Sequence, residues 1–364
     1  MADQLFYVAA VPFEAARKVE ILPTDHRASR LHGHSFIAKV RTEIQRSSVA
    51  FPGAELDYLR DALLSAVAPI DYSLLNDQVP VPTDENLARW VRNRLSVSNA
   101  SIVGIQSTSE QGVDLAHDDR AHLWRKYRFE AAHQLPNVPE GHQCGRMHGH
   151  GFEVILHVDQ DIGDSSMGID FDLIDQFWTP YQEKFHLACL NDIPGLENPT
   201  SEMLAGWIWA RLKPGVENLS WVTVYETHTS GCHFDGEHYR IWKEQRFESA
   251  CRLMEGPGND RRRSLHGHSY LVRLHLTAPL DKVMGWTVDY GDVKELFKPT
   301  YSQLDHHILN ELPGLDDTDA ASLVCWIKEQ MADQLPQLDR IDLYETPGCG
   351  AVLSWGKNGP ALPV

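Results

Sequence analysis

Three histidines in the middle of the sequence carry the clearest chemical signal. His148 and His150 are two positions apart in a stretch that predicts a β-strand, so both imidazoles point to the same face of the sheet. His133 ends the preceding predicted strand, and a hairpin would bring it alongside the other two. Three imidazoles with one coordination position left open are typical of a catalytic zinc site. These residues therefore predict zinc binding, whereas a lone His-Gly-His is also common among buried histidines that only satisfy hydrogen bonds.

The His-Gly-His tripeptide occurs three times, which strengthens the metal interpretation. It begins at His32, His148 and His266, at intervals of 116 and 118 residues. These intervals exceed the period of about 20–50 residues that is typical of solenoids and propeller blades. They predict three tandem copies of one small domain, with bounds at 1–118, 119–240 and 241–364.

The three copies differ at the position of His133. Arg17 corresponds to it in the first copy, and a guanidinium cannot ligate a metal because it has no acceptor lone pair. We therefore expect no metal in the first copy. Cys251 corresponds to it in the third copy, together with His266 and His268. Because a thiolate and two imidazoles can hold zinc, the third copy has either a second metal site or an ordinary buried thiol.

Only the middle copy has a thiol just before its His-Gly-His. Cys144 lies four residues before His148. The corresponding residues of the first and third copies are Ala28 and Arg262. A cysteine near a cation has a lowered pKa and can act as a base or a nucleophile. Cys144 is therefore a candidate catalytic residue.

The segments around these residues predict the elements that position them. In the middle copy, apolar residues recur at period two along 152–158, which is typical of a half-buried strand. Thr200 can cap a helix that follows a proline. The predicted strands are 124–133, 152–158, 221–226 and 238–242, and the predicted helices are 170–185 and 200–212. Each copy is therefore an α+β unit with the order ββααββ.

The copies follow one another without a Gly/Ser linker, since the last predicted strand of one runs almost directly into the first strand of the next. Such short joints favour side-by-side packing. Antiparallel sheets that pair their open edges around a ring would remove those edges. We therefore expect a closed or nearly closed barrel with the helices outside.

Composition excludes several classes of function. With 42% apolar and 23% charged residues the chain is typical of globular proteins, and no apolar run reaches the roughly 18 residues of a membrane span. A net charge of −18 argues against sequence-independent nucleic-acid binding. Six cysteines without a regular framework, and an N-terminus without a signal-peptide pattern, predict a cytoplasmic protein. The basic run 261–263 is either a solvated loop or a contact for an anionic substrate.

Several stretches of the chain resemble the 6-pyruvoyl-tetrahydropterin synthase / 6-carboxytetrahydropterin synthase family. The matching stretches are 129–133, 144–150, 198–202 and 225–227 in the middle copy, and 304–310 and 344–346 in the third copy. The resemblance covers essentially the whole chain, three times. The three-residue gap between Cys144 and His148 is similar to the bacterial carboxytetrahydropterin branch, which serves 7-deazaguanine and queuosine synthesis.

The resemblance implies the tunnelling fold, a zinc cofactor and 7,8-dihydroneopterin triphosphate as the substrate. It also implies that a cysteine works with an Asp-His pair in proton transfers, and that a glutamate anchors the pterin ring. The cysteine carries over to Cys144 and the pair to Asp305 and His306. The remaining substrate-binding candidates are Glu226, Glu345 and Thr200.

No copy retains the whole set of catalytic residues. The middle copy has His186 and Leu187 in place of the Asp-His pair, and the third copy, which has the pair, lacks the cysteine. If each of the three sites had lost its function independently, the missing residues would be scattered among the copies and no working site need remain. Complementary retention instead favours one composite site between the second and third copies, with the pair supplied by the same chain or by a partner chain. The first copy, which has Asp71-Tyr72 and Ser107 at the corresponding positions, is expected only to complete the ring.

The predicted function is that of a zinc-dependent lyase that forms 6-carboxy-5,6,7,8-tetrahydropterin and expels acetaldehyde and triphosphate. One alternative is a 6-pyruvoyl-tetrahydropterin synthase, in which triphosphate leaves but the carbon chain stays. Another is a zinc- and pterin-binding scaffold without activity. Because single-domain relatives form two stacked trimeric rings, two three-repeat chains are expected to stack as a homodimer. Arg146 and the run 261–263 are candidate contacts for the triphosphate.

Overall fold

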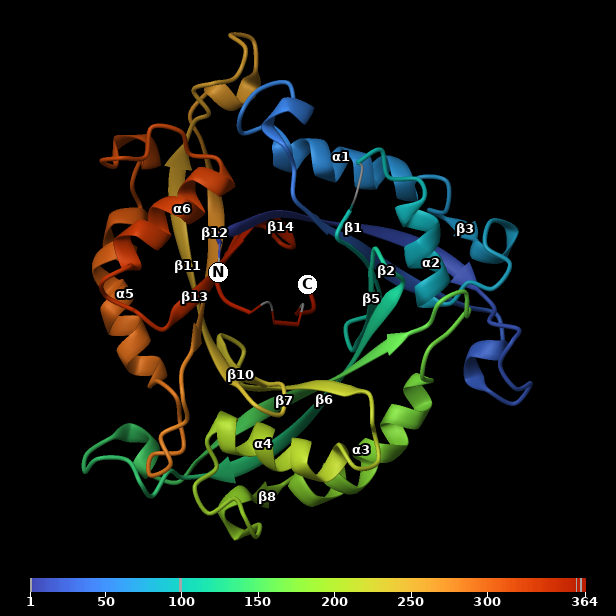
Figure 1. Cartoon of the computed structure of the whole chain (residues 1–364), viewed down its shortest axis with the longest axis vertical. Helices are drawn as coiled ribbons and strands as arrows, with labels where there is room; N and C mark the ends of the chain where they lie inside the picture. Colours follow the sequence, from blue (N-terminus) through green and yellow to red (C-terminus); the bar gives the residue numbers. More distant parts are fainter. Residues whose placement is uncertain (1, 98–99, 358, 361) are drawn as a thin grey trace.

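Twelve antiparallel strands, four from each repeat, close into a barrel in the part of the chain that the structure describes (Figure 1). The structure is a computed structural model that describes residues 2–97, 100–357, 359–360 and 362–364. The barrel strands are β1 (Gln4–Arg17), β2 (His32–Thr42), β4 (Ile102–Thr108) and β5 (Gln111–Ala116) in repeat 1, β6 (Arg120–His133), β7 (His148–Asp161), β9 (Leu219–Thr227) and β10 (Ser230–Phe234) in repeat 2, and β11 (Tyr239–Cys251), β12 (His266–Thr277), β13 (Leu338–Thr346) and β14 (Cys349–Ser354) in repeat 3. The predicted α+β fold with a barrel is confirmed.

The barrel closes because the last strand of each repeat pairs with the first strand of the next. Strand β5 pairs with β6, β10 pairs with β11, and β14 returns to pair with β1, where Gln4 lies opposite Ser354. Each barrel strand therefore has a neighbour on both sides, and closure satisfies the edge groups that a single repeat would leave open. Two short strands, β3 (Ser73–Leu74) and β8 (Ala188–Cys189), pair in parallel with β1 and β6.

The fourth strand of repeat 2 was assigned wrongly from the sequence. The strand predicted at 238–242 is the start of the long strand β11, which begins at residue 239, so the predicted boundary between residues 240 and 241 lies inside β11. The true fourth strand is β10, all of whose residues are buried. Gly231 weakens its β signal, yet a Cβ there would lie 2.3 Å from the Trp242 ring and 2.2 Å from the Val224 carbonyl oxygen. Only glycine fits under this ring, which explains why the strand was missed.

Within the described residues, six α-helices cover the outside of the barrel in pairs (Figure 1). The pairs are α1 (Glu55–Val67) with α2 (Asp84–Arg92), α3 (Phe171–Phe185) with α4 (Ser201–Leu212), and α5 (Tyr290–Leu304) with α6 (Ala320–Met331). Each pair buries an apolar cluster against the strands of its own repeat. The helix predictions at 170–185 and 200–212 are confirmed, and Thr200 caps α4 by accepting a hydrogen bond from the Met203 amide at 3.1 Å.

The inner face of the barrel is polar because side chains alternate along each strand. On β7, Leu156 and Val158 pack in the apolar cluster, whereas His157 turns inward and lies 2.8 Å from the Thr223 hydroxyl. Residues 362–364 line the same interior, where Figure 1 places the C-terminus. Among the residues that the structure describes, no helix has the length and apolar character needed to cross a bilayer.

Short 3-10 turns precede the three His-Gly-His strands. They are η1 (Arg27–Ser29), η4 (Gln143–Gly145) and η6 (Arg261–Arg263). Each strand β2, β7 and β12 starts at the first histidine of its tripeptide and pairs there with the end of the preceding long strand. The three candidate sites therefore lie at equivalent positions on one rim of the barrel.

Candidate active site at the joint of repeats 2 and 3

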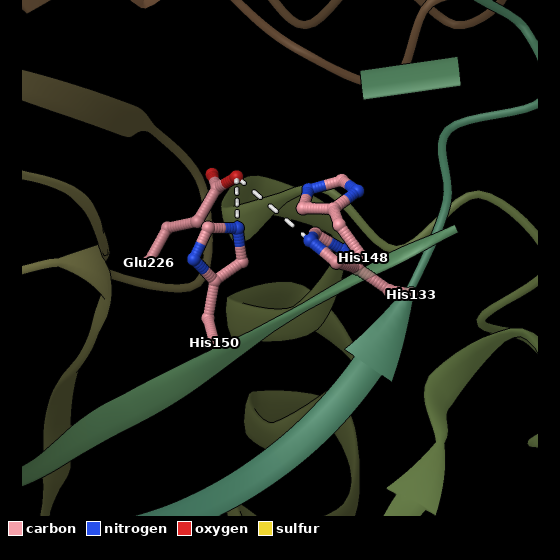
Figure 2. A group of neighbouring side chains, drawn as sticks. All are labelled: His133, His148, His150 and Glu226. Atoms are coloured by element: carbon pink, nitrogen blue, oxygen red, sulfur yellow. Dashed lines mark ion pairs between the residues drawn. The ribbon is translucent and has the colours of Figure 1, made fainter. Parts of the chain in front are cut away.

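Three histidines and one glutamate converge at the rim of repeat 2 (Figure 2). His133 ends β6 and lies opposite His148, the first residue of β7. The imidazole centroids are 4.5 Å apart for His133 and His148, 5.1 Å for His133 and His150, and 4.9 Å for His148 and His150. Glu226 on β9 places Oε1 3.7 Å from His150 Nε2 and 4.0 Å from His133 Nε2.

The hydrogen bonds of these imidazoles leave nitrogen lone pairs facing one another. His133 Nδ1 lies 3.0 Å from the Pro199 carbonyl, and His148 Nδ1 lies 2.7 Å from the Arg146 carbonyl. A carbonyl can only accept, so both Nδ1 atoms carry a proton and both Nε2 atoms keep a lone pair. Burial lowers the pKa of His133 to about 4 and also lowers the pKa of His150, which keeps both rings neutral.

This donor set fits a zinc ion. The Nε2 atoms of His133 and His150 are buried without a hydrogen-bond partner among the described residues, and a buried polar atom is costly unless something satisfies it. Neutral imidazoles whose other nitrogen donates to a carbonyl are the usual form of zinc-binding histidine. The three ligands predicted from the sequence therefore lie together, and Glu226 is close enough to join them.

Cys144, on η4, lies in a cavity beside these four residues. The cavity has a volume of about 640 Å³ and is also lined by His148, His150 and Glu226. Burial raises the pKa of the Cys144 thiol, and the nearby carboxylates of Glu226 and Asp289 raise it further. The side chains that act on this thiol are therefore carboxylates, which disfavour the thiolate, and a lowered pKa would need a cation that they do not supply.

The opposite wall of the cavity comes from repeat 3. Asp289, which caps α5, lies 3.3 Å from His142 Nε2, and His142 Nδ1 accepts the Cys144 amide at 3.2 Å. Trp286 and Tyr290 line the same wall. Sequence reasoning missed all of these residues. The recurrence of an aspartate before α3 and α5 was the available signal, since Asp170 pairs with His26 at 3.3 Å across the joint of repeats 1 and 2.

Thr200 also lines this cavity, but its hydroxyl is already engaged. It donates to the Gly285 carbonyl of repeat 3 and accepts the Met203 amide. A neighbouring carboxyl, Glu202, accepts the Thr287 amide of repeat 3 at 2.8 Å. These contacts fasten repeat 3 to the start of α4, so Thr200 shapes the cavity and has no free proton to donate to a ligand.

Asp305 and His306 lie elsewhere in the chain. Asp305 follows the last residue of α5, whose first residue, Tyr290, lines the Cys144 cavity. A helix of 15 residues is about 22 Å long at about 1.5 Å per residue, so the pair lies roughly that far from the cavity wall. The structure therefore does not bring the pair to Cys144 within one chain, and the same-chain form of the composite site is not supported.

The Asp305-His306 pair is nevertheless built and accessible. Asp305 Oδ2 lies 2.9 Å from His306 Nδ1, while its Oδ1 accepts the Glu248 amide at 3.0 Å. Hydrogen bonding from this amide is the main cause of the lowered pKa of Asp305. His306 has a φ of 59° and an imidazole that is 77% exposed. The ring therefore points away from its own repeat on the same rim as the histidine clusters.

Repeat 1 has Arg17, held in a buried ion pair, in place of the predicted metal ligand His133. Arg17 NH1 lies 2.6 Å from Asp84 Oδ1 and donates to the Pro82 carbonyl at 3.0 Å. The Ser107 hydroxyl donates to the other Asp84 oxygen at 2.7 Å. Arg17 NH2 also lies 3.4 Å from His34 Nε2. A guanidinium therefore lies beside His34, the ring that corresponds to His150 of repeat 2.

The remaining predicted residues lie at the joint of repeats 3 and 1. Glu345 lines a cavity there with Cys251, His266 and His268, and therefore lies apart from Cys144. In the basic run 261–263, Arg262 pairs with Asp57 of repeat 1 and with Asp260. Arg263 donates to two backbone carbonyls. The run thus lies at the joint of repeats 3 and 1 and does not line the Cys144 cavity.

Comparison with known proteins matches the three repeats separately. The profile of the family described as 6-pyruvoyl tetrahydropterin synthase matches residues 8–109, 122–237 and 240–355. The chain belongs to this family. Each matched segment contains one His-Gly-His strand and one pair of helices.

Among curated relatives, a 6-carboxy-5,6,7,8-tetrahydropterin synthase of Synechocystis is 41% identical over 120 residues, which cover 31% of this chain and 91% of that protein. A dihydroneopterin monophosphate aldolase of Pyrococcus furiosus is 28% identical over 94 residues, which cover 25% of this chain and 79% of that protein. A 6-pyruvoyl tetrahydropterin synthase structure from Caenorhabditis elegans is 19% identical, covers 32% of this chain and 95% of its own, and has a TM-score of 0.29. These relatives correspond in length to about one repeat.

Proposed function

We propose that the chain is a 6-carboxy-5,6,7,8-tetrahydropterin synthase that acts on 7,8-dihydroneopterin triphosphate and releases acetaldehyde and triphosphate. The observation that carries the proposal is the single cavity in which Cys144 and Glu226 meet the histidine cluster. Family membership and the relative of that name at 41% identity support the reaction class.

The residues that would hold zinc are His133, His148 and His150. When bound, the ion supplies Lewis-acid polarisation of the substrate's side-chain oxygens. The Pro199 and Arg146 carbonyls orient two of the three rings, so the chain itself fixes the positions of the donor atoms. Cys144, on the η4 turn of the same cavity, would take a proton from the substrate carbon next to those oxygens.

Glu226 is the proposed anchor for the pterin ring. Burial raises its pKa to about 7, and the nearby carboxyls of Glu202 and Asp289 contribute to this shift. The amino group and ring N–H of a pterin present two donors to a carboxylate, and hydrogen bonding to the charged form favours it. Binding of the ring would therefore hold Glu226 ionised, and Glu345, in another cavity, would not take part in this site.

The Asp305-His306 pair is proposed to enter the Cys144 cavity of a partner chain. The exposed position of the pair on the barrel rim supports this arrangement. Tyr72 and Leu187 occupy the place of His306 in repeats 1 and 2. They are 85% and 80% exposed and also have a positive φ. Leu31, Met147 and Leu265, one before each His-Gly-His, are exposed on the same rim. A rim with repeated apolar side chains fits a second copy, and we propose a homodimer of two stacked rings.

Two-fold symmetry fixes how the repeats would face one another. An isologous interface is reciprocal, so if repeat 2 receives the pair from the partner's repeat 3, then repeat 3 faces the partner's repeat 2. Repeat 1 must then face the partner's repeat 1. The dimer would contain two complete sites, each with Cys144 from one chain and His306 from the other.

The assay that tests this function measures both products with 7,8-dihydroneopterin triphosphate and the zinc-loaded protein. Release of acetaldehyde and triphosphate in equal amounts is expected. Triphosphate without acetaldehyde would identify the alternative 6-pyruvoyl-tetrahydropterin synthase reaction, and neither product would identify a pterin-binding scaffold. A role in 7-deazaguanine and queuosine synthesis is proposed from the resemblance to 6-carboxytetrahydropterin synthases. A cytoplasmic location is proposed because all six cysteines are free thiols.

A further inference from the structure

We infer that repeat 3 holds a second metal ion, bound by Cys251, His266 and His268. The sulfur of Cys251 and one nitrogen from each imidazole all lie within 4.8 Å of one another. Cys251 ends β11 and lies directly opposite His266 at the start of β12, so the two ligands are fixed by strand pairing. Neither turnover nor the proposed lyase function enters this inference.

The separation of the donor atoms matches metal coordination. Cys251 Sγ lies 3.6 Å from His266 Nε2. Bonds of about 2.3 Å to sulfur and about 2.0–2.1 Å to nitrogen, at a tetrahedral angle, put two ligand atoms about 3.6 Å apart. His266 Nδ1 lies 2.8 Å from the Ser264 carbonyl and therefore carries the proton, which leaves Nε2 with its lone pair toward the sulfur.

A buried hydroxyl group also contacts the sulfur of Cys251. The Tyr270 hydroxyl, which is buried, donates to Cys251 Sγ at 3.5 Å. The corresponding residue of repeat 2 is Phe152, whose ring meets the edge of His133. Repeat 3 therefore replaces a His-Phe pair by a Cys-Tyr pair, and the added hydroxyl donates to the sulfur.

The surroundings favour a divalent cation and leave one coordination position open. The three ligands line a cavity of about 870 Å³ between repeats 3 and 1. Its described lining contains six carboxylates and three arginines, and it is therefore acidic. These are Glu55, Asp57, Asp61, Asp260, Asp319 and Glu345 against Arg60, Arg261 and Arg262. A thiolate with two imidazoles selects zinc over magnesium or calcium, which prefer oxygen ligands.

This second centre differs from the first in its chemistry. Arg262 occupies the place that Cys144 has in repeat 2, and Asp57 and Asp260 hold its guanidinium. The cavity therefore has a metal site without the thiol base beside it. The ligand sulfur also gives this centre a spectroscopic signature that the three-histidine centre lacks.

Cobalt substitution tests the inference on the full chain. After removal of metal by a chelator, the wild type should bind two Co²⁺ per chain and develop a near-ultraviolet sulfur-to-cobalt charge-transfer band. Cys251→Ser should bind one Co²⁺ and lose the band. Two matched controls, Cys144→Ser and His148→Ala, should keep the band. Cys144→Ser should still bind two Co²⁺, whereas His148→Ala should bind one.

Two results would overturn the inference. One is a wild type that binds a single Co²⁺ without the band. The other is a band that persists in Cys251→Ser and disappears in Cys144→Ser, which would make Cys144 the sulfur ligand. If Cys251→Ser fails to fold by circular dichroism, His268→Asn keeps the thiol and should also bind one Co²⁺. None of these readouts uses turnover, so failure here is distinguishable from failure of the proposed lyase function.

Discussion

Replacing Arg17 by methionine should destabilise the protein strongly, because it leaves a buried carboxylate without its cation. The Arg17 and Asp84 side chains are 7% and 2% exposed, and their nearest nitrogen and oxygen are 2.6 Å apart. Breaking such a pair from one side costs about 3–5 kcal/mol, since the remaining charge stays buried. Methionine keeps most of the volume of arginine, so the loss reports the charge and not a cavity.

The assay is urea unfolding followed by circular dichroism, with the shift in midpoint converted to a free-energy difference through the slope of the transition. The double variant Arg17→Met/Asp84→Asn is the control. It removes both charges, keeps an acceptor for the Ser107 hydroxyl, and should recover all but about 1–1.5 kcal/mol of the loss. A single variant within about 0.5 kcal/mol of the wild type would refute the interpretation that this buried pair stabilises repeat 1.

Three further changes are predicted. Cys144→Ala should lower kcat about 10²–10⁴-fold while zinc content stays unchanged, and wild-type rates of acetaldehyde release would remove Cys144 as the base. Gly231→Ala should lower thermal stability by about 1–3 kcal/mol, because a Cβ would lie 2.3 Å from the Trp242 ring and 2.2 Å from the Val224 carbonyl oxygen; an unchanged Tm would contradict this close packing. Burial acts to raise the pKa of Asp342, but Arg340 and His275 outweigh it and hold the pKa well below 3.8. Since a depressed carboxyl pKa stabilises above the unfolded value, this contribution is lost as pH falls below 3.8. Asp342→Asn should therefore lower Tm at neutral pH and flatten its acid dependence, and an acid limb as steep as that of the wild type would contradict the assignment.

The sequence predicted local features of the site and of the fold well. His133, His148 and His150 could be placed together because a hairpin and an alternation of period two are local properties. The recurrence of the tripeptide also indicated three repeats and the ring that they close.

Features that depend on contacts between repeats could not be predicted in this way. The wall formed by Trp286 and Asp289 comes from residues more than 130 positions after His148, and nothing in their local pattern indicates the joint. Strand β10 was missed because Gly231, which the Trp242 ring requires, carries no β signal of its own. The sequence left open which chain supplies Asp305, because the separation of this residue from the cavity depends on how α5 lies against the barrel.

Complementation between inactive chains tests most directly whether the site is shared by two chains. Cys144→Ala and His306→Ala chains with different tags would be co-expressed, and heterodimers purified through both tags in succession. In a heterodimer, the His306→Ala chain supplies Cys144 and the Cys144→Ala chain supplies His306, so one of the two sites is intact. The heterodimer should show about half of the wild-type rate per dimer, whereas each parent homodimer should be near background. A heterodimer at background, or no protein retained through both purifications, would contradict it.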